Sequence, residues 1–143
     1  LQVPYIMMHM QGTPQNMQQN PVYTNVVTDL LYYFSKKITE LHKLGVNDII
    51  TDVGFGFGKT IEHNYQLLKH LALVKNLETP LLAGMSRKGM LYKPLGITAE
   101  SALNATTAAN TVALLNGASI LRVHDVKEAV EAVKIVNLLN NKI

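Results

Sequence analysis

The stretch that decides the fold is Thr51-Asp52-Val53-Gly54-Phe55-Gly56-Phe57-Gly58-Lys59-Thr60. It follows a short apolar run and precedes a helical pattern that begins at Ile61, so it predicts the end of a strand, a glycine-rich loop and the start of a helix. Three glycines in five residues let the backbone lie flat against a ligand and adopt positive φ without a steric cost. Asp52 stands where the strand ends, so we expect its carboxylate to face the loop side of the sheet.

Two familiar glycine-loop patterns do not fit this stretch. A P-loop requires a glycine five residues before Gly58, and Val53 occupies that position. A dinucleotide fingerprint requires a third glycine that would fall on Lys59 or Ile61. An ordinary tight strand-to-helix turn remains open as the simpler interpretation.

Composition places the chain among globular proteins. Its 143 residues are 48% hydrophobic and 16% charged, which suffices for one core. There is no cysteine, which excludes disulfides and thiolate metal sites. No run approaches the ~18 apolar residues of a membrane span, and no export signal opens the chain, so we expect a cytoplasmic protein without membrane contact. The net charge of +3 is scattered, which disfavours nucleic acid as a partner and suits a small anionic ligand.

The chain alternates strands and helices four times. Each apolar run is followed by a helical pattern, and this alternation predicts a parallel sheet with right-handed crossovers. An open doubly wound sheet and half of an eight-fold barrel both remain possible. The expected strands are Val3–Met10, Asp48–Asp52, Leu81–Met85 and Ala118–His124. The expected helices start at Val22 (ended by Gly45), Ile61 (broken at 76–80), Ser101 (closed by Gly117) and Val126, the last after a capping-box spacing, Asp125-x-x-Glu128; polar loops are expected over 11–21 and 86–100.

Polar side chains collect at all four carboxyl ends of the expected strands. Parallel α/β folds hold their sites at this end, because the loops there converge. Arg122 and His124 are two residues apart on a strand and therefore project from the same face. We expect three cations, Arg87, Lys88 and Arg122, to converge with the carboxylate of Asp52. Simpler interpretations stay open: an ion pair of Arg122 with Asp52 or Asp125, His124 bonded to a carbonyl, and Lys88 in a solvated loop.

Four segments together resemble one family. Met7-Met8-His9-Met10-Gln11-Gly12, Thr51–Lys59, Gly84-Met85-Ser86-Arg87-Lys88 and Arg122-Val123-His124-Asp125 are similar to the dihydropteroate synthases, in order and at fitting spacings. The resemblance implies a TIM (β/α)8 barrel, with residues 1–143 forming one pterin-binding domain that is the C-terminal half of the barrel, strands five to eight.

The resemblance also implies the reaction. Members of that family condense 6-hydroxymethyl-7,8-dihydropterin pyrophosphate with para-aminobenzoate, giving 7,8-dihydropteroate and pyrophosphate in folate biosynthesis. Asp52 would accept hydrogen bonds from the N–H edge of the pterin, Lys88 would donate to the ring acceptors, and Arg122 would stack on the ring. Arg122 and His124 would hold the pyrophosphate. The remaining residues implied at the substrate site are Met8, Gly56, Phe57, Gly84, Ser86, Arg87 and Gly89.

The chain departs from the family pattern in three ways. Val53 replaces a proline, which changes the stiffness of the loop. Gly89 replaces a serine that helps hold the para-aminobenzoate carboxylate, although the backbone N–H of Gly89 could still serve. The family's first half is not in this sequence, which opens inside an apolar run, so we expect that the N-terminal part of a longer protein is missing. Residues 1–143 alone should then have an incomplete active site, with Mg²⁺ bound by the missing half and by the pyrophosphate. The family resemblance also implies a homodimer in the full-length protein, through the outer helices 101–116 and 126–140.

Two other functions remain as alternatives. One is a methyltetrahydrofolate-dependent methyltransferase on a related pterin-binding barrel, which would not need both the Ser-Arg-Lys and the Arg-Val-His-Asp segments. The other is a non-catalytic barrel half that acts as a partner or regulatory subunit.

Overall fold

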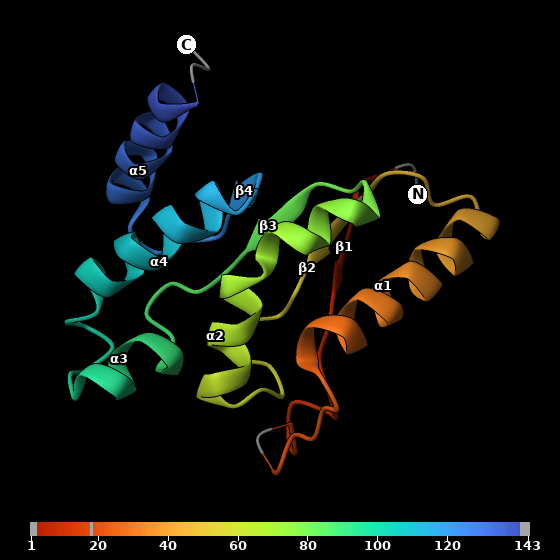
Figure 1. The fold of residues 1–143 in the computed structure, drawn as a ribbon, viewed down its shortest axis with the longest axis horizontal. Coiled ribbons are helices and arrows are strands. Elements are labelled where there is room, and N and C mark those ends of the chain that lie inside the picture. The colour runs from red at the N-terminus through yellow and green to blue at the C-terminus, as the bar shows by residue number, and fades with distance from the viewer. Residues whose placement is uncertain (1–2, 18, 141–143) are drawn as a thin grey trace.

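The fold is a four-stranded parallel sheet in which the strands follow one another in chain order (Figure 1). The computed structural model describes residues 3–17 and 19–140. An unbroken order β1-β2-β3-β4 has no switch point, which fits part of a barrel and excludes a doubly wound sheet. The strands are β1 (Tyr5–Met8), β2 (Ile49–Asp52), β3 (Leu81–Ala83) and β4 (Ile120–Leu121). The helices are α1 (Val26–Lys43), α2 (Ile61–Lys69), the 3₁₀ helix η1 (Leu71–Leu77), α3 (Gly89–Leu95), α4 (Leu103–Leu115) and α5 (Val126–Leu139).

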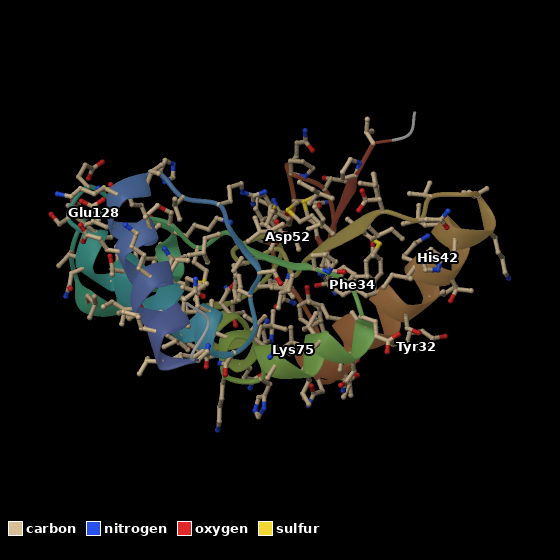
Figure 2. All side chains as sticks on the ribbon, turned by 90° about the horizontal axis from the view of Figure 1, so that it is seen from above. Tyr32, Phe34, His42, Asp52, Lys75 and Glu128 are labelled. Atoms are coloured by element: carbon tan, nitrogen blue, oxygen red, sulfur yellow. The ribbon has the colours of Figure 1, made fainter. Side chains whose placement is uncertain are left out.

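The two faces of the sheet have different surroundings. One face of the sheet packs against the helices, and its side chains belong to the main core. They include Met7, Ile49, Leu81 and Ala83, whereas Asp52 points to the other face. On the opposite face Met8 is in register with Asp52, and Asp52 with Leu82. Figure 2 shows Phe34 pointing from α1 toward the sheet, with α1 and α2 on the same side. Ile6, on the opposite face, remains 48% exposed, as expected for the interior of a half barrel.

Caps fix the starts of the first two helices. Asn25 accepts hydrogen bonds from the backbone N–H groups of Val27 and Thr28, so α1 begins at Val26, four residues later than its hydrophobic pattern suggested. Gly45 follows the end of α1 with φ of +79°, as expected. Thr60 caps α2 through His63. The regular α-helix then ends at Lys69 and continues as η1, which shortens the expected helix.

The segment 86–100 was predicted to be a loop, and this prediction is wrong. It contains α3, because Met90 and Leu91 pack into the core at 3% exposure each. Pro94 concealed the helix in the sequence, since proline lacks the N–H that would bond the carbonyl four residues earlier. That carbonyl belongs to Met90, and it accepts a hydrogen bond from Tyr65 Oη at 3.1 Å instead.

Two further expectations need correction. Asp125 precedes α5 but makes no capping hydrogen bond, because its carboxylate is bonded to Arg87. The outer strands are also shorter than their apolar runs: β1 covers four residues and β4 two. Both are edge strands with a partner on one side only, so much of each run is left without ladder pairing. Within the described residues, no helix combines the length and apolar character that a membrane span requires.

Candidate active site at the carboxyl ends of the strands

The glycine loop between β2 and α2 lies directly against the end of β1. Gly54, Gly56 and Gly58 all have positive φ, between +61° and +80°. A Cβ atom at Gly58 would stand 2.5 Å from the carbonyl oxygen of Gln11, and one at Gly54 would collide with the carbonyl of His9. Glycine is therefore required here for both conformation and close approach, and the ordinary-turn interpretation understates the packing.

Lys59 holds this loop in place. It is only 3% exposed, and its Nζ donates to the carbonyl oxygens of Phe57 (2.9 Å), Gly54 (3.0 Å) and His9 (3.3 Å). Burial lowers the pKa of Lys59 to about 7. Nδ1 of His9 lies 3.1 Å from the same nitrogen, and burial together with the charge of Lys59 lowers the pKa of His9 to about 4. His9 is thus neutral at pH 7.

Sequence reasoning missed the structural role of Lys59 and its neighbour Asn64. Asn64 is 2% exposed, accepts a hydrogen bond from Gly56 N–H at 2.7 Å and donates to the carbonyl of Thr60. The sequence shows only that a lysine and an asparagine follow the glycine loop. Their position does not reveal that both side chains are buried.

One carboxylate oxygen of Asp52 accepts no hydrogen bond in the described part of the chain. The residue is 1% exposed, and its Oδ1 accepts a hydrogen bond from Gly54 N–H at 2.8 Å. Oδ2 lies 3.2 Å from Nη2 of Arg122, within ion-pair distance, yet it has no hydrogen bond within residues 3–17 and 19–140. The two groups form an ion pair, but the guanidinium N–H is not aligned for donation to this oxygen. Buried polar atoms are normally bonded, so this oxygen is available for N–H donors of a ligand.

Lys88 lies beside the same carboxylate. Its Nζ donates to the carbonyl of Phe55 at 2.6 Å and stands 4.5 Å from the centre of the Phe57 ring. Burial lowers the pKa of Lys88 to about 8; the charge of Asp52 opposes this shift and that of Arg122 adds to it. These couplings place Asp52, Lys88 and Arg122 in one electrostatic cluster, as predicted.

Gly84 allows Arg122 to cross the end of the sheet. A Cβ atom at position 84 would lie 2.8 Å from Nη2 of Arg122, so any side chain there would displace the guanidinium. The side chain of Arg122 is 51% exposed and has room for a ligand on its open side. Met8, in register with Asp52, is half-buried on the same face.

His124 is oriented by Ser86. The hydroxyl of Ser86 lies 2.9 Å from Nδ1 of His124 and accepts a hydrogen bond from its backbone N–H at 3.2 Å. Ser86 is 5% exposed, whereas His124 is exposed. With Nδ1 occupied in this way, Nε2 is the ring nitrogen left to face a ligand.

Arg87 does not join the cluster around Asp52. Its guanidinium forms a two-bond ion pair with Asp125, at 2.8 and 2.9 Å, and donates to the carbonyls of Ala99 and Glu100. This hydrogen-bonded pair holds the pKa of Asp125 below its usual range. The expected convergence of three cations is therefore wrong for Arg87, which instead joins the loops that follow β3 and β4.

Two observations bear on ions and cavities. In the part of the chain that the structure describes, no three His, Cys, Asp or Glu side chains come together as metal ligands. A hollow of about 720 Å³ lies away from the cluster, among η1, α4, β4 and α5. It is lined by residues that precede β4, such as Gly117 and Ser119, at the opposite end of the strands, so we do not assign the site to it.

Comparisons with known proteins agree with this geometry. A family model described as "Pterin binding enzyme" matches residues 1–124. The dihydropteroate synthase of Escherichia coli K12 is 42% identical over 136 residues, covering 94% of this chain and 48% of that relative. A Yersinia pestis dihydropteroate synthase, solved as a sulfonamide drug complex, matches with a TM-score of 0.94 at 43% identity, over 99% of this chain and 52% of that one.

A second solved structure that matches is also a complex with a small molecule. The dihydropteroate synthase of Thermus thermophilus in complex with 4-aminobenzoate has a TM-score of 0.91 at 32% identity, over 97% of this chain and 58% of that chain. The present chain thus spans about half the length of the curated relatives that it matches.

Proposed function

Since this chain belongs to the family of pterin-binding enzymes, we propose that the full-length protein is a dihydropteroate synthase. Residues 1–143 would form part of its single pterin-binding domain, namely the C-terminal half of a (β/α)8 barrel. The amine nitrogen of 4-aminobenzoate attacks the methylene carbon of 6-hydroxymethyl-7,8-dihydropterin pyrophosphate. The C–O bond to the leaving group breaks, pyrophosphate departs and the amine loses a proton. A strong general base is not required, because an aniline nitrogen already carries its lone pair.

The free oxygen of Asp52 is the observation that carries this proposal. It is buried, it makes no hydrogen bond within the described residues and it has Nη2 of Arg122 at 3.2 Å, and a carboxylate is well suited to accept two ring N–H bonds from a pterin. Lys88, on the other side of the cluster, donates to the oxo and nitrogen acceptors of the ring. Met8, Gly56, Phe57 and Gly84 form the walls of the slot.

Arg122 and His124 hold the leaving group. Both side chains are exposed on the ligand side of the sheet, and Ser86 directs His124. Fixed cations and N–H donors stabilise the charge that builds on pyrophosphate as it departs. Arg87, which is bound to Asp125, would act on this region only by fixing the two loops.

Magnesium, the other half of the barrel and the dimer complete the proposal. The described residues offer no metal-binding cluster, so we assign Mg²⁺, which would neutralise pyrophosphate charge, to the preceding half and to the pyrophosphate itself. A homodimer is supported by the apolar side chains that α5 leaves exposed, which are Val126, Val130, Ile135, Leu138 and Leu139. We also propose that the full-length protein is located in the cytoplasm.

Replacing Asp52 with Asn in the full-length protein tests the proposal. The variant loses a charge-assisted hydrogen bond, so pterin affinity should fall by roughly 1–3 kcal/mol. Calorimetry with a pterin ligand measures this, and Asp48→Asn, at the far end of β2, is the matched control. Unchanged pterin affinity in Asp52→Asn would rule out the assigned role.

A further inference from the structure

A second hollow adjoins the Asp52 cluster. It has a volume of about 400 Å³ and lies between the glycine loop, the start of α2 and α3, with Gly56, Thr60, Gly89 and Lys93 in its walls. Lys88 connects it to the cluster: its Cδ lies 3.3 Å from the position that a Cβ of Gly56 would take, and the next residue is Gly89. A ligand in this hollow would therefore stand next to a pterin bound at Asp52 and Lys88.

Lys93 occupies the space left by the missing side chain of Gly89. The two residues are four apart on α3 and so lie on the same side of the helix. From the position of a Cβ at residue 89, Cε of Lys93 is 3.3 Å away, Cδ 3.5 Å and Nζ 3.8 Å. The lysine stem packs across the glycine backbone, which places its ammonium group at the wall of the hollow.

The ammonium group of Lys93 has no partner in residues 3–17 and 19–140. It forms no ion pair and no hydrogen bond there, and the residue is exposed. The two other lysines near the loop differ, since Lys59 is bonded to backbone carbonyls and Lys88 to Phe55. Lys93 is thus the cation in this hollow that is available for an anion.

We propose that Lys93 binds the carboxylate of the aromatic amine substrate and makes this protein select a charged substrate over a neutral one. The inference rests on the proposed function, which requires an aminobenzoate beside the pterin. A Thermus relative is described in complex with 4-aminobenzoate. Gly89 has no side chain that could donate a hydrogen bond to this carboxylate. The ammonium group of Lys93, whose stem packs across Gly89, supplies a charged donor that acts over a longer distance.

The test compares two ligands that differ in charge. Calorimetry on the full-length protein, with a pterin, Mg²⁺ and pyrophosphate present, measures the Kd of 4-aminobenzoate and of 4-aminobenzamide, its uncharged isostere. Lys93→Met should weaken binding of 4-aminobenzoate by about 2- to 5-fold, as expected for a partly exposed charge pair, and leave binding of 4-aminobenzamide unchanged. Lys93→Arg should retain most of the affinity. Lys69→Met, at the far end of α2, makes the same charge change away from the hollow and should change neither Kd.

The outcomes separate this inference from the proposed function. Equal losses for the two ligands in Lys93→Met, or no loss for either, would overturn the role of Lys93, even if the protein makes dihydropteroate normally. A selective loss for 4-aminobenzoate in a protein that forms no product would support the carboxylate site and contradict the proposed function. Selectivity for 4-aminobenzoate that does not fall at high salt in the unsubstituted protein would also count against it, since an ionic contact is screened.

Discussion

At the scale of single residues, buried polar groups shape the site more than its exposed charges do. Lys59 satisfies three backbone carbonyls, and Ser86 fixes a histidine ring, yet neither residue stands out in the sequence as a structural element. Each acts through a partner far along the chain. Their effects can be measured separately from those of the groups that contact ligands.

The first residue-level prediction separates binding of the leaving group from binding of the ring. Replacing His124 with Ala should weaken pyrophosphate by about 1–2 kcal/mol and a neutral pterin by much less, because the imidazole lies beside Arg122 and away from the ring-binding carboxylate. Ser86→Ala should act in the same direction but less strongly, since it frees the ring without removing it. Calorimetry with both ligands on the full-length protein decides this. Equal losses for the two ligands would contradict the assignment.

The second residue-level prediction concerns pH. The pKa of His9 is about 4 in the folded protein, below its usual value, so between about pH 4 and 6.5 the unfolded chain binds a proton that the folded protein does not. Stability should therefore rise with pH through this window and be lost as pH falls. The slope should exceed that of a His9→Gln variant by up to ~1.4 kcal/mol per pH unit.

Urea unfolding of the full-length protein at several pH values measures both slopes. His42→Gln, the same substitution at an exposed site, is the control variant. Parallel slopes for His9→Gln and the unsubstituted protein would show that His9 takes up its proton equally in the folded and unfolded states, which would contradict the prediction.

At the scale of elements, a hydrogen bond from a neighbouring helix satisfies a backbone carbonyl of α3 that has no partner within its own helix. Pro94 deprives the carbonyl of Met90 of its helical partner, and Tyr65 from α2 donates to it. The contact ties α3, which begins directly after Lys88, to the helix that follows the glycine loop. The hydrogen bond between α2 and α3 thus connects the glycine loop with the loop that carries Lys88.

A double-mutant cycle tests this link. Tyr65→Phe should lower the free energy of unfolding by about 0.5–1.5 kcal/mol, because it leaves a carbonyl unsatisfied. In a Pro94→Ala background the same change should cost much less, since the restored N–H of residue 94 can bond to Met90. Tyr32→Phe on α1, 75% exposed, is the matched control and should cost nothing measurable. Additive effects of Tyr65→Phe and Pro94→Ala would show that the two residues do not share this carbonyl.

At the scale of the whole molecule, the half barrel exposes surfaces that a closed barrel would cover. β1 and β4 each pair on one side only, and Tyr5 and Ile6 are both 48% exposed. Apart from Pro4, the edge strands carry none of the lysine, proline or bulge devices that protect natural sheet edges. The interior of a closed barrel is filled by side chains from all its strands, and here four strands supply only part of them.

Residues 1–143 expressed alone should therefore associate or remain molten, and should bind neither substrate tightly. Sedimentation gives the size of the species, and thermal melting its cooperativity. A full-length protein that contains the chain should melt sharply in the same buffer. A monomer of 143 residues with a sharp melt and measurable turnover would refute this prediction.

The sequence by itself determined the fourfold alternation of strands and helices, the end of the sheet at which the site forms, and the cluster of Asp52 with Lys88 and Arg122. These follow from local causes, because hydrophobic periodicity sets each element and polar residues at the strand ends share one edge. The positive φ of the loop glycines is equally local. Even the departure of Gly89 from the family pattern is visible in the sequence.

Only the tertiary structure decided which long side chains meet. Arg87 binds Asp125, 38 residues away, and Lys59 meets His9, 50 residues away, because strand register brings their loops together. The carboxylate of Asp125, which has the spacing of a capping box, is therefore bonded to the guanidinium of Arg87. Lys59, at the end of the glycine loop, bonds to backbone carbonyls of that loop and stabilises it from inside. The helix α3 was hidden for the same reason: the burial of Met90 and Leu91 and the donation from Tyr65 outweigh the local effect of Pro94, and both arise from packing between elements.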